Sequence, residues 1–215
     1  MKNIKNLGIK TLEGFTVGNL QRFPSMEWGD EGGLQADVYY KGIKILQVFQ
    51  EGNGGCAITY TNANYDANQT EIDVQCLRFL QRVDEDYGPN GRFSNLYKDK
   101  KIVVEKGKEV AKGLDDDDWE RLVVIIESRY DDLKNIKKFL KKDPTVVVCE
   151  TDWQTRYFGY NAKANLPSND PEDIRLFKEA VVGAVKKYAA QAYPKEHYTQ
   201  CTAYLASDVP NLETI

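Results

Sequence analysis

Apolar and polar positions alternate along the first third of the chain with the two-residue period of β-strands. Residues 34–40 and 43–49 are rich in Val, Ile, Leu, Tyr and Phe, and a single Lys-Gly pair separates them. A turn at 51–55 contains Asn-Gly, whose positive φ values suit a tight hairpin, and residues 56–60 follow it as a further strand. We therefore expect three strands in meander order.

The segments before this meander are less regular. Residues 10–18 alternate loosely, whereas residues 21–33 are rich in Gly and acidic side chains. Glycine and short polar residues favour turns and irregular backbone. We therefore expect residues 21–33 to form a loop.

Three later segments have apolar residues about 3.6 positions apart, which is the period of an amphipathic helix. These segments are residues 70–86, 115–142 and 171–191. The second is the clearest, because acids crowd its first turn and lysines its last, in keeping with the helix macrodipole. The third starts at a proline, and Ser168 or Asn169 before it is the expected N-cap.

Strand patterns return between and after these helices. Residues 145–150 and 155–160 predict a hairpin, and residues 198–206 predict a last strand. Strands grouped apart from helices favour an α+β fold. We expect an N-terminal antiparallel β-meander, two to three amphipathic helices packed on a mixed or antiparallel sheet, and a C-terminal hairpin, helix and strand.

The domain organisation follows from the same pattern. A chain of 215 residues is long enough for one domain spanning residues 1–215. It also permits a subdivision into residues 1–88 and 114–206, joined by a loop at 89–113 in which only residues 102–104 have an extended pattern.

Composition narrows the class of protein without identifying an activity. The 29 Lys+Arg and 33 Asp+Glu give a net charge of −4, which argues against general binding to nucleic-acid backbones. No apolar core of signal-peptide length opens the chain, and the aliphatic run 122–126 is far shorter than the roughly 20 residues that cross a bilayer. We therefore expect a cytoplasmic protein that neither contacts a membrane nor carries a cofactor.

The cysteines and the histidine offer little catalytic chemistry. Cys56, Cys76, Cys149 and Cys201 are dispersed and include no CxxC pair, so small apolar roles are expected rather than a zinc site. Whether they converge in space stays open. His197 is the chain's one imidazole, and on an extended strand it would lie roughly 13 Å from Cys201, too far for direct proton transfer.

A run of four acids has two interpretations. It consists of Asp115, Asp116, Asp117 and Asp118. The first turn of a helix favours acids, by about 0.3–1 kcal/mol each, so capping explains the run. An acidic surface for a partner is the alternative, and the lack of alternate spacing argues against a calcium loop.

Three further groups of residues are candidates for binding or catalysis. Trp28 and Trp153 are the aromatics that a core explains least easily, and we expect them at an interface. Glu150 and Asp152 follow a buried strand and could hold a metal ion in a hydrolase or nuclease. A third possibility, single-strand nucleic-acid binding, would use Tyr97 with the lysines of 98–108.

The segment ADVYYKGIKILQVFQEGNGG, residues 36–55, resembles a hairpin and turn that recur in small uncharacterised proteins of bacteriophages and plasmids. The resemblance implies an accessory gene of a mobile element, with no catalytic residues to carry over. Together with the missing catalytic motifs, it predicts a non-enzymatic protein that binds another protein, such as a component of a host defence system, and inhibits it. The metal-dependent hydrolase and the nucleic-acid binder remain the alternatives.

Overall fold

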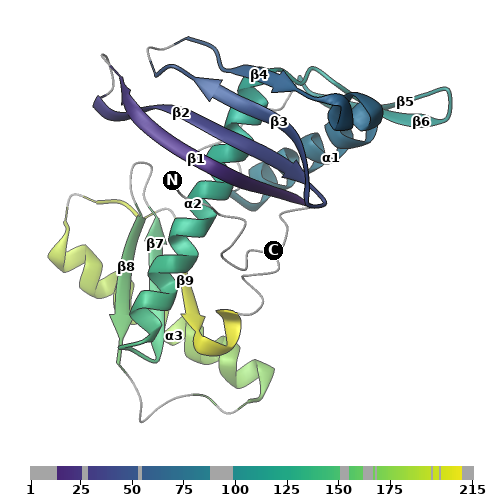
Figure 1. Cartoon of the computed structure of the whole chain (residues 1–215). Helices are drawn as coiled ribbons and strands as arrows, with labels where there is room; N and C mark the ends of the chain where they lie inside the picture. The colour runs from purple at the N-terminus through teal and green to yellow at the C-terminus, as the bar shows by residue number, and fades with distance from the viewer. Residues whose placement is uncertain are drawn as a thin grey trace. The chain divides into compact units, whose positions relative to one another are not determined.

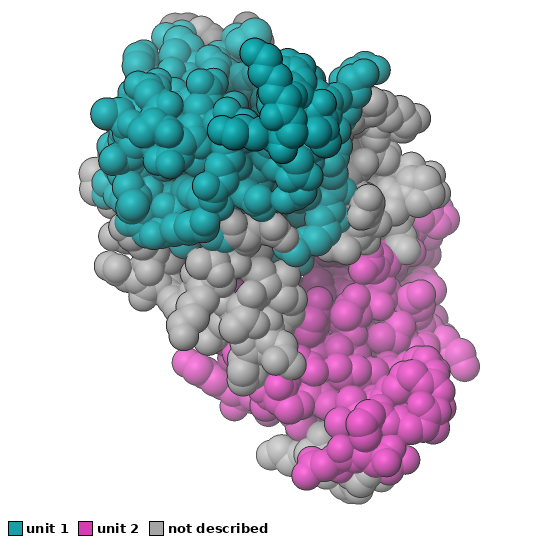
Figure 2. Space-filling model, turned by 90° about the vertical axis from the view of Figure 1, so that its right-hand side faces the viewer, with its two compact units in different colours: residues 1–130, 214–215 teal, residues 131–213 magenta. Residues whose placement is uncertain are grey.

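The computed structural model describes residues 14–25, 29–52, 55–87, 99–150, 155–161, 167, 169–194, 196–198 and 200–209. The fold is α+β, as the sequence predicts, with every strand pair antiparallel (Figure 1). Two compact units divide the chain, residues 1–130 with 214–215 and residues 131–213 (Figure 2). The boundary falls inside one helix, α2 (Asp116–Leu140), so both units use this helix.

The first unit is built on a four-stranded sheet. Its strands are β1 (Phe15–Ser25), β2 (Gly29–Tyr40), β3 (Ile43–Gln50) and β4 (Ile58–Thr61), paired in sequence order. The expected meander is confirmed, and it includes one more strand than the sequence predicts.

The expected loop over 21–33 is wrong, because most of it continues β1 and β2. Phe23 of β1 lies opposite Gly33 of β2 in the register. A Cβ on Gly33 would lie 2.2 Å from Cε2 of Phe23, so this glycine makes room for an aromatic ring. A glycine inside a strand can therefore resemble a loop glycine when only the sequence is considered.

Residues 101–112, expected to be mostly loop, form a second hairpin. It consists of β5 (Lys101–Glu105) and β6 (Lys108–Lys112). Lys106 and Gly107 turn the chain with φ of 50° and 78°, and Lys41 and Gly42 between β2 and β3 have φ of 48° and 82°. Two consecutive positive φ values are those of a type I′ turn, which suits a two-residue hairpin. The charged residues around the second Lys-Gly pair hide its strand pattern.

Helices α1 (Ala63–Tyr87) and α2 lie on the same side of the four-stranded sheet (Figure 1). The α1 helix starts seven residues before the expected Thr70, because Asn62 Oδ1 accepts hydrogen bonds from the amides of Asn64 (2.9 Å) and Tyr65 (3.2 Å). Trp119 of α2 joins the layers, with ring centroids 6.0 Å from Phe15 and 6.0 Å from Tyr65. The core between sheet and helices includes Val17, Leu34, Val38, Leu46, Leu77, Leu80, Leu122 and Ile126, all buried.

The second unit has a three-stranded sheet with a helix against each face. Strands β7 (Thr145–Glu150), β8 (Thr155–Tyr160) and β9 (Gln200–Leu205) pair in the order β8-β7-β9. Helix α3 (Pro171–Ala192) buries Val147 and Cys149 of β7, while Ile136 of α2 packs on Val146 and Val148. Successive side chains of β7 are therefore buried on opposite faces, which explains its unbroken apolar run.

Two details complete the second unit. The N-cap of α3 is Asp170 rather than the expected Ser168 or Asn169, because its carboxylate accepts hydrogen bonds from the amides of Glu172 (2.8 Å) and Asp173 (3.3 Å). A short 3₁₀ turn, Ala206–Asp208, follows β9. Over the described parts of the chain, none of the helices has a stretch apolar and long enough to cross a membrane.

Candidate functional site

The acidic run at the start of α2 is engaged within its own chain. Asp115 and Asp118 exchange hydrogen bonds, from the Asp115 amide to Asp118 Oδ2 (2.9 Å) and from the Asp118 amide to Asp115 Oδ1 (3.1 Å). This reciprocal pair caps the helix. The fully buried Asp118 carboxylate also accepts hydrogen bonds from Lys100 Nζ and from Arg121 Nη1 (3.2 Å).

The other two acids attach the helix to the sheet. The Ala57 amide donates to Asp117 Oδ1 (3.0 Å), and the Thr59 amide and hydroxyl donate to Asp116 (3.3 and 2.6 Å). These bonds occupy backbone donors at the edge strand β4. The geometry therefore gives the run a capping and attachment role, and a partner at this run stays a prediction.

The remaining sequence candidates are dispersed or lie outside the described residues. Trp28, Trp153, Asp152, Tyr97 and Lys98 are not among the residues that the structure describes. Glu150 is half-buried at the end of β7, between Thr155 and Gln200 in the register. His197 is exposed. Within the described ranges, no three His, Cys, Asp or Glu side chains are placed to share a metal ion.

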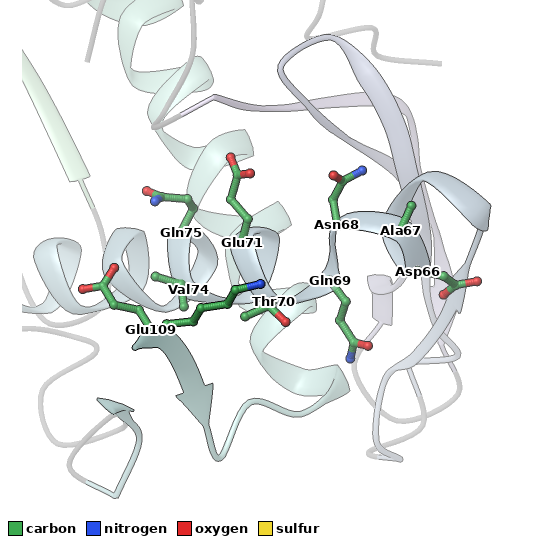
Figure 3. Close-up of a pocket in the computed structure, with 10 residues that line it drawn as sticks. Asp66, Ala67, Asn68, Gln69, Thr70, Glu71, Val74, Gln75 and Glu109 are labelled. Carbon is green, nitrogen blue, oxygen red and sulfur yellow. The ribbon is translucent and has the colours of Figure 1, made fainter. Parts of the chain in front are cut away.

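A polar groove runs along the first turns of α1, where Asn68 interrupts the helix with φ of −128° and ψ of 15° (Figure 3). Its volume is about 570 Å³, and β6 contributes Lys108 and Glu109 to its wall. Two of its carboxylates already bind cations of this chain. Glu71 accepts hydrogen bonds from Lys41 (2.8 Å) and Tyr40 (3.1 Å), which lower its pKa, and Glu109 pairs with Arg78 (2.6 Å). We assign no ligand to this groove.

The sheet face opposite to α1 and α2 presents a different surface, which we call the aromatic face. Phe49 lies opposite Gln35 and Ile58, and Gln47 lies opposite Tyr60, so these five side chains project from one face. The aromatic face consists of Phe23, Gln35, Gln47, Phe49, Ile58 and Tyr60.

Apolar side chains of the aromatic face remain accessible to solvent. The rings of Phe23 and Phe49 stack with centroids 5.7 Å apart, and both are half-buried. On the edge strand, Ile58 is 45% exposed and Tyr60 is 56% exposed. Ile43 is also exposed but lies opposite Tyr40, on the other side of the sheet.

The charge on this side of the sheet is balanced locally. Asp37, which is 4% exposed, accepts hydrogen bonds from Asn19 (2.7 Å) and Gln47 (3.1 Å) and pairs with Lys44 (2.7 Å). Burial by itself raises the pKa of Asp37, but these three partners outweigh burial and hold its pKa below the ordinary value. The ionised Asp37 therefore neutralises Lys44, and this ion pair adds no net charge to the surface.

Sequence reasoning missed the aromatic face because its residues come from four strands. Phe23 belongs to a segment expected to be a loop, and Phe49 and Tyr60 belong to different strands of the meander. The sequence shows that apolar and polar residues alternate along 43–49. Which side chains of neighbouring strands share a face depends on the register between the strands, which the sequence does not show. The cysteine pair Cys149 and Cys201 was missed for the same reason, since the register places them opposite each other on β7 and β9.

Comparison of the chain with family models, curated proteins and solved structures gave no match.

Proposed function

We propose that this chain is a binding protein that recognises another protein through its aromatic face. The observation that carries the proposal is the exposure of Ile58 and Tyr60 beside the stacked rings of Phe23 and Phe49. Aromatic side chains, Tyr in particular, contribute much of the binding energy in protein interfaces. Glutamines 35 and 47 add hydrogen-bonding groups between the apolar side chains.

The local charge favours a protein over a nucleic acid as the partner. A protein that binds the phosphate backbone needs several free cations. On this side of the sheet, the Lys44 ammonium pairs with the Asp37 carboxylate at 2.7 Å, so its charge is already neutralised. A surface of aromatic rings and amides, on which Asp37 pairs with Lys44, fits a partly apolar protein surface with little charge.

The position of the edge strand adds a constraint on how the partner docks. The outward amides of Ala57 and Thr59 bond to Asp117 and Asp116, so these donors are not available to a strand added at the β4 edge. Docking on the face of the sheet leaves these bonds intact. An inhibitor of a host protein, the role expected from the missing catalytic motifs in the setting that the resemblance implies, is compatible with such a surface.

Site-specific crosslinking tests the proposal. The photoreactive amino acid p-benzoylphenylalanine is placed at position 60, and at position 188 as the control, because Tyr188 is 61% exposed on α3. After irradiation of cells of the organism that encodes the chain, we expect one abundant protein adduct at position 60 and not at 188. No adduct at position 60, the same adducts at both positions, or an adduct to nucleic acid would overturn the proposal.

Substitution of the same side chains provides an independent measurement. We expect Ile58→Ser/Tyr60→Ser to weaken binding to the crosslinked partner by at least about tenfold, because hot-spot truncations cost about 2 kcal/mol or more. The matched control is Val104→Ser on β5, where the side chain is 72% exposed outside the aromatic face. Unchanged affinity in the double variant, with the far-UV circular dichroism of the native chain, would contradict the assignment of the surface.

A further inference from the structure

The central sheet of the second unit places two thiols opposite each other. Cys149 of β7 and Cys201 of β9 are direct partners in the antiparallel register. Both side chains project toward α3, where Cys149 belongs to the core cluster and Cys201 packs against it. Both are free cysteines in the structure, with Cys149 buried and Cys201 half-buried.

The backbone geometry of such a pair suits a disulfide. Directly opposed residues in antiparallel strands have Cα atoms about 4.5–5.5 Å apart, within the roughly 4.4–6.8 Å that a disulfide spans. Neighbouring register pairs hold this geometry on both sides, Val148 with Thr202 and Glu150 with Gln200. The Cα spacing of such a pair therefore lies in the range that a disulfide requires.

We propose that Cys149 and Cys201 form a redox-active pair that is converted to an intramolecular disulfide by a peroxide oxidant. The half-buried Cys201 reacts first. Its thiol loses a proton, the thiolate sulfur attacks one oxygen of hydrogen peroxide, and the O–O bond breaks. Cys201 sulfenic acid and hydroxide are formed, and the hydroxide takes up the released proton to give water. The Cys149 sulfur then attacks the Cys201 sulfur and loses its proton. The S–S bond forms, the S–O bond breaks, and a second water leaves. The two thiols lose two hydrogens, and one peroxide is reduced to two waters.

The order of these steps follows from the two environments. Burial raises the pKa of the Cys149 thiol, and the neighbouring Cys201 thiol raises that pKa further, so Cys149 is a poor first nucleophile. Cys201 reaches solvent and is the side chain that an oxidant can meet. The disulfide would join β9 to β7 across the whole segment 150–200, which includes β8 and α3.

The experiment uses the full chain with Cys56→Ser, because Cys56 is exposed and would form bonds between molecules. The reduced and the peroxide-treated protein are denatured, alkylated with N-ethylmaleimide and weighed by mass spectrometry. Of the three thiols that remain from the four cysteines, we expect three to be alkylated in the reduced protein and one after oxidation. Trypsin should release residues 143–156 linked to residues 196–215, and dithiothreitol should separate them.

Two further measurements distinguish a bond between Cys149 and Cys201 from a bond to a different thiol. We expect Cys201→Ser, added to Cys56→Ser, to abolish the linked peptide. We also expect the oxidised Cys56→Ser protein to melt several degrees higher than its reduced form, because the crosslink restricts the unfolded chain. Cys76 is buried in the other unit and serves as the internal control thiol. Three alkylated thiols after oxidation, or a linked peptide that contains Cys76, would overturn the proposal, whatever the outcome for the aromatic face.

Discussion

Replacement of Asp118 by Asn tests the structural role of the acidic run most directly. Asp118 is fully buried, and its carboxylate is bonded to Lys100, whose side chain is only 11% exposed. Asn has nearly the same shape, and its side-chain oxygen can still accept the hydrogen bond from the Asp115 amide. The substitution therefore removes the buried negative charge while it keeps the helix cap, and it leaves the largely buried Lys100 ammonium with the more exposed carboxylate of Asp115, 3.1 Å away, as its remaining partner.

The expected loss of stability is large for a substitution that replaces one carboxylate oxygen by an amide nitrogen. Removal of one partner from a buried ion pair costs about 3–5 kcal/mol, because the remaining charge stays desolvated. Since Asp115 still pairs with Lys100, we expect the lower end of this range, about 3 kcal/mol. The free energy of unfolding of a typical domain is about 5–15 kcal/mol, so a fifth or more of the stability is at stake. With a urea dependence of about 2 kcal/mol/M, the unfolding midpoint should fall by roughly 1.5 M.

Urea titration followed by far-UV circular dichroism measures this loss, and Asp116→Asn is the matched control. Asp116 belongs to the same run but bonds to exposed groups of Thr59, so its replacement should cost about 1 kcal/mol or less. Addition of Lys100→Met to Asp118→Asn should recover at least half of the loss, since the largely buried ammonium that lost its Asp118 partner is then gone. Equal costs for Asp118→Asn and Asp116→Asn would refute the reasoning from burial.

Three further predictions concern the first unit. Gly33→Ala should cost about 1–3 kcal/mol in the unfolding free energy, because its Cβ would lie 2.2 Å from the Phe23 ring, and differential scanning calorimetry should register a lower melting temperature. Gly107→Ala should cost about 1 kcal/mol by urea titration, entirely through its φ of +78°, since nothing lies within 4 Å of the added methyl group. The depressed pKa of Asp37 implies stabilisation that is present above its ordinary pKa of 3.8 and is lost as the pH falls through its folded value. The unfolding free energy of Asp37→Asn, measured between about pH 5 and pH 2, should therefore fall less steeply than that of the native chain.

The parts of the fold that follow from local chemistry could be predicted from the sequence. The Lys41-Gly42 turn, with alternating apolar residues on both sides, specifies the hairpin of β2 and β3. The acids at the start of α2 and the lysines at its end specify that helix within two residues at each boundary. In both cases the signal lies within one element or its immediate neighbours in sequence.

The parts that depend on distant partners could not be predicted. Glycine is common in loops, so the sequence around Gly33 predicts a loop. Its place in a strand is explained by Phe23, ten residues earlier, which lies opposite it in the register. Cys149 and Cys201 become neighbours through the register of β7 with β9, and α3 lies between these strands in sequence. The candidate site shares this dependence, since the aromatic face draws on four strands and no single segment contains its pattern.

Helix α2 has one continuous apolar stripe, and this stripe supplies buried side chains to both units. Its apolar stripe suggests a single buried side, yet Trp119, Leu122 and Ile126 belong to the first unit and Ile136 packs in the core of the second. At a rise of about 1.5 Å per residue, 25 residues extend for about 37 Å, long enough to supply both cores. Helix formation is costly to start and cheap to extend, so a helix held by one core favours the helical state in the residues that the other core uses. The continuous helix therefore links the stability of the two units, and a loss at Asp118 in its first turn should extend beyond the first unit.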